Sequence, residues 1–104
     1  MTPQEVRSRV EEEIGENWAL SNAHGIELSR CLVTPQKGGY RDSFHEGQTI
    51  ELWLVLEEDP VARKGYKIVY DEDADKFGLA VADDKSAGVF LGLYGSFLET
   101  LSGM

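Results

Sequence analysis

Apolar residues near the N-terminus recur at the spacing of an amphipathic helix. Thr2 and Glu5 stand at the positions of a capping box, and Pro3 between them suits the first helical position. We therefore expect the helix to begin after Thr2, with Gly15 weakening its last turns. The apolar stripe that should face the core consists of Val6, Val10, Ile14 and Trp18.

A second amphipathic helix is expected at the C-terminal end. Asp84 or Ser86 can cap its N-terminus, and Gly103 ends it. Glycines along one flank of this segment indicate close approach to another part of the backbone. Its apolar residues at helical spacing are Phe90, Leu93, Tyr94, Phe97, Leu98 and Leu101.

Between these helices the apolar positions alternate with polar ones, which indicates strands. Arg30 interrupts the alternation of the first strand. The second is the clearest, and its Ile50, Leu52, Leu54 and Leu56 should face one way. The expected strands are residues 26–33, 49–57, 66–71 and 77–81.

This order predicts an α+β fold, α-β-β-β-β-α, in which a four-stranded antiparallel meander carries the N- and C-terminal helices on one face. Residues 36–47 form a long connection between the first two strands, and long ordered loops are often functional. If a small-molecule pocket lies between the sheet and the helices, this loop would be its lid or rim. Its candidate contact residues are Tyr40, Arg41, Phe44 and His45.

Length and charge narrow the classes of function. A chain of 104 residues with 41% hydrophobic residues should fold as one domain, residues 1–104. Its net charge of -9 disfavours direct binding to nucleic acid or to anionic membrane. The single cysteine, and the lack of a leader segment or apolar span, favour a cytoplasmic protein.

Metal and cofactor sites are not indicated. Asp71, Asp73 and Asp75 alternate as at the start of an EF-hand loop, but Lys76 stands where that loop needs glycine. A solvated turn is the favoured interpretation. The two histidines, His24 and His45, do not show zinc-ligand spacing with each other or with Cys31.

Catalytic residues are not indicated either. Cys31 is expected to be a half-buried thiol, and Ser96 lacks the flanking pattern of a nucleophile elbow. Only Glu51, beside Trp53, stands in an apolar setting that would raise the pKa of a carboxyl group. An enzyme is therefore the third-ranked interpretation, with no catalytic residue named.

The sheet face opposite the helices is the most informative feature. It is half apolar, so it requires cover from sheet curvature, a second subunit, a ligand or a partner. Trp53 with nearby glutamates has the composition of a small interface, although a bent sheet folding over its own aromatic is the alternative. This face contains Val33, Glu51, Trp53, Val55, Glu57, Val69 and Ala80.

The leading hypothesis is a non-enzymatic binding protein whose acidic surface meets a basic protein partner. Small acidic immunity proteins and inhibitors of basic nucleases have this general character. We expect the contact set to combine the Trp53 face with Asp71, Asp73 and Asp75 of the acidic turn.

The alternative is a homodimer joined through the same sheet face, with a small-molecule pocket between sheet and helices. Aromatic residues from both helices and the third strand would line that pocket. They are Trp18, Tyr66, Tyr70, Phe90 and Tyr94.

Overall fold

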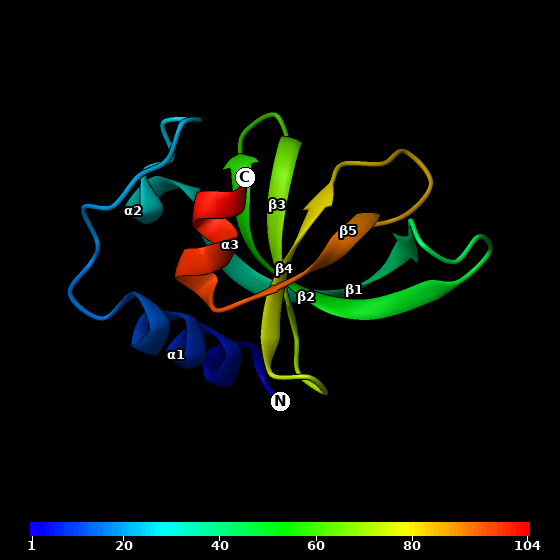
Figure 1. The fold of residues 1–104 in the computed structure, drawn as a ribbon, viewed down its shortest axis with the longest axis horizontal. Helices are drawn as coiled ribbons and strands as arrows, with labels where there is room; N and C mark the ends of the chain where they lie inside the picture. The colour runs from blue at the N-terminus through cyan, green and yellow to red at the C-terminus, as the bar shows by residue number, and fades with distance from the viewer.

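The computed structural model describes all residues, 1–104 (Figure 1). Five strands, paired in chain order, close into a barrel, and helices cover one side of it. The ring closes where β1 runs parallel to β5, through Tyr40 to Asp42 against Gly88 to Phe90. The elements are α1 (Pro3–Ile14), α2 (Leu28–Cys31), β1 (Leu32–Asp42), β2 (Thr49–Asp59), β3 (Lys64–Asp71), β4 (Lys76–Val81), β5 (Gly88–Gly95) and α3 (Phe97–Gly103).

Helix α1 begins as its sequence predicts. The Thr2 hydroxyl accepts from the Glu5 amide, the Glu5 carboxylate accepts from the Thr2 amide, and Pro3 occupies the first turn. The helix ends at Gly15, whose φ of 57° lies in the left-handed region that favours glycine. Trp18 therefore lies beyond the helix and is 40% exposed. No helix has the length and apolar character needed to cross a membrane.

The α+β class and the antiparallel meander are confirmed, with five strands in place of the expected four. The additional strand is β5, which lies in the segment expected to begin the last helix. Gly92 and Gly95 have φ values of 131° and 118°, which side-chain-bearing residues rarely adopt. Close backbone approach does occur, but between strands: a Cβ on Gly78 of β4 would collide with the Gly92 carbonyl of β5. Only α3 remains helical.

The first strand also differs from the expectation. Residues 28–31 form the short helix α2, and β1 continues through most of the expected long loop, so the connection to β2 is only residues 43–48. Glycines make this possible because a Cβ on Gly39 would meet Thr49 at 3.0 Å, and one on Gly38 would meet Ala87 at 3.0 Å. The prediction of a lid over residues 36–47 was therefore wrong for residues 36–42.

The two faces of the sheet bury two separate cores. The outer face packs against the helices through one large cluster. The interior holds a small cluster with one residue from each strand: Tyr40, Leu52, Val69, Ala80 and Phe90. The outer cluster contains Val6, Val10, Ile14, Ile26, Leu28, Cys31, Trp53, Val55, Leu56, Ile68, Tyr70, Phe77, Leu79, Phe97 and Leu101.

A bulge in β2 places Leu52 and Leu56 on opposite faces of the sheet, although the alternation predicts that they share one face. The pairing with β3 shifts between Leu54 and Leu56, so the uniform alternation of the sequence does not hold. Leu52 belongs to the interior cluster, whereas Leu56 and Trp53 belong to the cluster under the helices. Both helices cover one face, as expected, but it is the face of Trp53.

Candidate functional site

The sheet face proposed as an interface is not on the surface. Trp53 is 5% exposed, and Val55 and Val69 are 1% and 0% exposed, so the expected exposure of this face was wrong. Helix packing covers Trp53 and Val55, and barrel closure encloses Val69. Among the other residues assigned to this face, Ala80 and Glu57 are buried, Val33 is half-buried and Glu51 is exposed.

Hydrogen bonds hold the acidic turn between β3 and β4 in place. The Asp71 carboxylate accepts hydrogen bonds from two backbone amides of the turn. Asp75, at a φ of 52°, accepts from the Tyr70 hydroxyl and from Arg9 of α1. These hydrogen bonds lower the pKa of Asp75, with the Tyr70 hydroxyl the larger cause. Of the three aspartates named from sequence, only Asp73 is exposed without a side-chain partner.

Glu72 joins this turn to the rest of the molecule. Its carboxylate binds the Lys37 ammonium at 2.8 Å, the Met1 amino group at 3.1 Å and the Trp53 indole N–H at 3.2 Å. Lys37 lies 5.6 Å from the Trp53 ring centroid, within range of a cation–π contact. The hydrogen bond from Lys37, followed by those from the N-terminus and Trp53, lowers the pKa of Glu72 to about 2. The indole of Trp53 is therefore a buried anchor for the turn.

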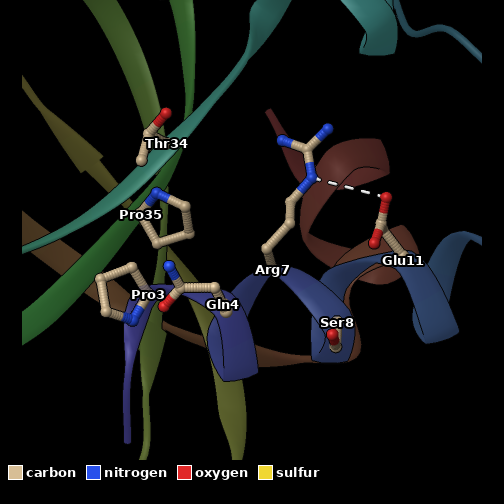
Figure 2. A pocket seen from close by; sticks show the side chains of 7 residues that line it. All are labelled: Pro3, Gln4, Arg7, Ser8, Glu11, Thr34 and Pro35. Atoms are coloured by element: carbon tan, nitrogen blue, oxygen red, sulfur yellow. Dashed lines mark ion pairs between the residues drawn. The ribbon is translucent and has the colours of Figure 1, made fainter.

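Helix α1 stands as a ridge between two hollows. The larger, about 510 Å³, lies between α1 and β1, and Figure 2 shows Pro3 and Gln4 facing Pro35 across it. Its single cation, Arg7, is paired with Glu11 at 3.7 Å. A shallower hollow of about 380 Å³ lies on the other side of the helix, next to Met1.

The exposed side of α1 and the adjoining β3–β4 turn form an acidic surface, which we call the acidic ridge. Its carboxylates are Glu5, Glu12, Asp71, Asp73 and Asp75.

The aromatic residues expected to line a pocket lie apart. Trp18 and Tyr94 are 40% and 45% exposed. Tyr66 packs edge-on against the His24 ring. Tyr70 belongs to the outer core and Phe90 to the interior cluster, on opposite faces of the sheet. These five side chains therefore do not line one common pocket.

The residues expected in a lid are also divided. Tyr40 and Arg41 belong to β1, where Tyr40 is buried in the barrel and Arg41 binds Asp83 at 3.0 Å. Phe44 and His45 do lie in the short β1–β2 loop, and Phe44 is 68% exposed. This loop is far from the helices, at the right of Figure 1.

The cysteine and histidines have ordinary partners. The buried Cys31 thiol donates to the Glu58 carbonyl at 3.7 Å, and His24 Nδ1 lies 3.0 Å from the Glu58 carboxylate. His45 pairs with Asp42 at 2.9 Å. No three His, Cys, Asp or Glu side chains are grouped as metal ligands.

Three charged side chains meet at the barrel interior, and one of them is Glu57, which the sequence placed on an exposed face. Glu57 and Lys67 are direct cross-strand partners, 2% and 5% exposed, and their charged atoms lie 3.4 Å apart. Arg63, at the β2–β3 connection, places its Nε 2.8 Å from the same carboxylate, while its side chain is 58% exposed. The group therefore reaches from the interior to the surface.

Two adjoining cavities open beside this group, of about 260 and 90 Å³, and share Gln36, Leu54 and Arg63. Tyr40 lines the smaller one, and burial, followed by the nearby Glu57 charge, raises the pKa of Tyr40 to about 12. Tyr40 is 1% exposed, and its hydroxyl makes no hydrogen bond within the chain. We call this the mouth pocket, defined by Gln36, Tyr40, Leu54, Glu57, Arg63 and Lys67.

Sequence reasoning did not find the mouth pocket because it placed Glu57 on a solvated face and did not single out Lys67 or Arg63. The available signal was a glutamate following a run of five apolar residues, Leu52 to Leu56. Such a residue is buried once a bulge alters the alternation.

Comparison with known proteins found no family model, curated protein or solved structure that matches this chain. A fold alone does not specify function, so the evidence on function lies in the geometry of the acidic ridge and the mouth pocket.

Proposed function

We propose that this protein is a non-enzymatic binding protein that docks a basic protein partner on its acidic ridge. The observation that carries the proposal is the fixed position of the backbone segments that present these carboxylates. The capping box sets the start of α1, and Arg9 ties the helix to Asp75 of the turn. Preorganised groups lose little conformational entropy on binding, so they favour association.

The charge balance supports the same proposal. Of ten Lys and Arg side chains, six form ion pairs with carboxylates of this chain. The acidic excess therefore remains on the surface, where it steers association with a basic partner. Lys76 is the one cation of the turn region without an ion pair, and the acidic residues around it outnumber it. The cations outside ion pairs are Arg30, Lys64, Lys76 and Lys85.

The buried position of Trp53 changes the earlier hypothesis of an aromatic anchor and a sheet-face homodimer. Helices of the same chain cover that face, so it needs no second subunit. Trp53 instead supports the β3–β4 turn, because its indole N–H donates a hydrogen bond to Glu72. The proposed contact surface is accordingly electrostatic.

The test neutralises two exposed ridge carboxylates that form no hydrogen bond or ion pair within the chain, in the double variant Glu12→Gln/Asp73→Asn. A partner is first captured from a cell lysate on the immobilised wild-type protein at low salt and identified. We expect its association rate constant with the variant to fall about tenfold at low salt and to change little at high salt, because screening removes steering.

The matched control is Glu46→Gln/Asp84→Asn, which removes the same charge from the two loops at the other end of the barrel (Figure 1). Its association rate should stay within about twofold of wild type at matched salt. Equal slowing by the two double variants would assign the effect to net charge and reject the ridge. Failure to retain any basic protein would reject the proposal itself.

A further inference from the structure

We propose that the mouth pocket is a binding site for a small molecule bearing one carboxylate group. Arg63 and Lys67 would hold the carboxylate, and the Tyr40 hydroxyl would donate to it. None of the residues that line the pocket belongs to the acidic ridge, so this inference is independent of the proposed protein partner.

The charge of the pocket is opposite to that of the whole protein. Arg63 and Lys67 contribute two positive charges and Glu57 one negative charge, which leaves a net charge of +1 in a chain of net charge -9. Lys37 also borders the pocket, but its ammonium binds Glu72 and Glu51. One monoanion would therefore neutralise the site, whereas a dianion would leave excess negative charge beside Glu57.

The donors of the pocket have unused capacity. Arg63 contacts Glu57 only through Nε, so the two terminal nitrogens of its guanidinium make no bond within the chain. The Lys67 ammonium has three N–H groups and one bond, at 3.4 Å. The Tyr40 hydroxyl is a third donor, on a residue 1% exposed that lines the cavity. Carboxylate oxygens accept several such bonds, and a planar guanidinium matches their geometry.

The shape of the pocket limits the ligand to a small molecule. Cavities of about 260 and 90 Å³ adjoin, and Leu54 lines both. Val33 and Pro60 provide further apolar surface in the larger of the two cavities. A short apolar body attached to the carboxylate would lie against these side chains. The Arg63 side chain is 58% exposed, so a ligand can reach its guanidinium from solvent.

A purely structural role explains this arrangement less well. Replacing a buried ion pair by apolar residues is often neutral or stabilising, so a role in stability alone does not account for a charged pair at this position. The rest of the interior cluster is apolar, with Leu52, Val69 and Ala80 fully buried. A third charge, a free hydroxyl and a cavity beside the pair are features that a ligand would use.

The test is an NMR titration of the ¹⁵N-labelled protein at pH 7 with sodium benzoate and sodium acetate as probes. Sodium chloride and sodium phosphate serve as comparison salts at matched ionic strength. We expect saturable shifts of amides lining the mouth pocket, with a dissociation constant for benzoate in the millimolar range, about what such small probes achieve. Chloride and phosphate should give only weak, non-saturating shifts.

Three variants make the test specific. Arg63→Asn removes the charge at a φ of 59°, a conformation that asparagine tolerates, and should weaken benzoate binding at least tenfold. Tyr40→Phe keeps the ring and should weaken binding several-fold. Lys64→Gln removes an exposed cation outside any ion pair and should leave the affinity within about twofold of wild type.

Three results would overturn the inference. The first is the lack of a saturable shift with either carboxylate, and the second is an equal response to phosphate. The third is an Arg63→Asn variant that binds benzoate as well as Lys64→Gln does. A folded spectrum of each variant in the same titration separates lost binding from lost structure.

Discussion

The outer and inner faces of the same sheet differ in composition and in packing. The outer face and the helices that cover it form one cluster of fifteen buried apolar side chains, seven of which come from the strands. The barrel interior joins five residues into its apolar cluster and places the Glu57–Lys67 pair beside two cavities. Dense apolar packing stabilises a fold, whereas buried charges beside open space do so poorly. The difference indicates that the outer face supplies most of the packing that stabilises the fold, and the interior is where we propose that a ligand binds.

The largest expected effect tests the outer face. Phe77 is 1% exposed and packs against Tyr70 and Phe97, with ring centroids 4.8 and 5.7 Å away. Phe77→Ala should lower the free energy of unfolding by about 3–5 kcal/mol, measured by urea denaturation. The control Phe44→Ala removes a ring that is 68% exposed and should cost less than about 1 kcal/mol. Similar losses in the two variants would contradict the assignment of stability to this core.

A second test concerns the buried pair. Glu57→Leu leaves the Lys67 ammonium buried without a partner and should lower the free energy of unfolding by about 3 kcal/mol. The double variant Glu57→Leu/Lys67→Met should recover most of that loss because it removes both charges. Urea denaturation of Glu57→Leu, Lys67→Met and the double variant completes the cycle. A double variant as unstable as Glu57→Leu would mean that the pair itself stabilises the barrel.

The smallest expected effect is a pH dependence at the edge of the outer face. The pKa of Glu72 is lowered to about 2, mainly by Lys37, so its contribution to stability is present above the ordinary value of 4.5 and is lost as pH falls toward 2. Glu72→Gln should therefore flatten the dependence of unfolding free energy on pH in that window. Denaturation at several pH values measures this slope. An unchanged slope would show that Glu72 is equally ionised in the folded and unfolded chains.

The sequence predicted helix α1 and three of the strands correctly, because interactions between residues close in the chain determine these elements. The capping box of Thr2 and Glu5 and the stripe Val6, Val10 and Ile14 gave helix α1 correctly. Strands β2, β3 and β4 were also found, because each alternates over several residues. In these elements the pattern and the tertiary structure agree.

Strand β5 was missed because its aromatic residues coincide with helical spacing. Phe90 and Tyr94 are four positions apart and lead directly into the true helical positions Phe97 and Leu101. In the structure Phe90 points into the barrel and Tyr94 is 45% exposed. Glycine spacing gave the opposite signal, since each glycine disfavours a helix and permits close strand approach.

The candidate site depended on facts that a single sequence does not contain. Alternation placed Trp53 and Glu57 on one solvated face, but the β2 bulge and the closure of the barrel bury both on opposite faces. The acidic turn was located correctly, yet its internal bonds leave only Asp73 free among the three aspartates. These outcomes depend on long-range pairing.

The short parallel contact between β1 and β5 has a consequence for the order of assembly. Every other strand pairing joins neighbours along the chain, whereas this one joins the first strand to the last through three residue pairs. Contacts between distant segments carry a larger entropic cost of loop closure, so local hairpins are favoured to form before the ring is completed. Until that step the barrel is an open sheet, and Glu57 and Lys67 keep their hydration. The cost of removing water from these charges therefore falls on the last stage of folding.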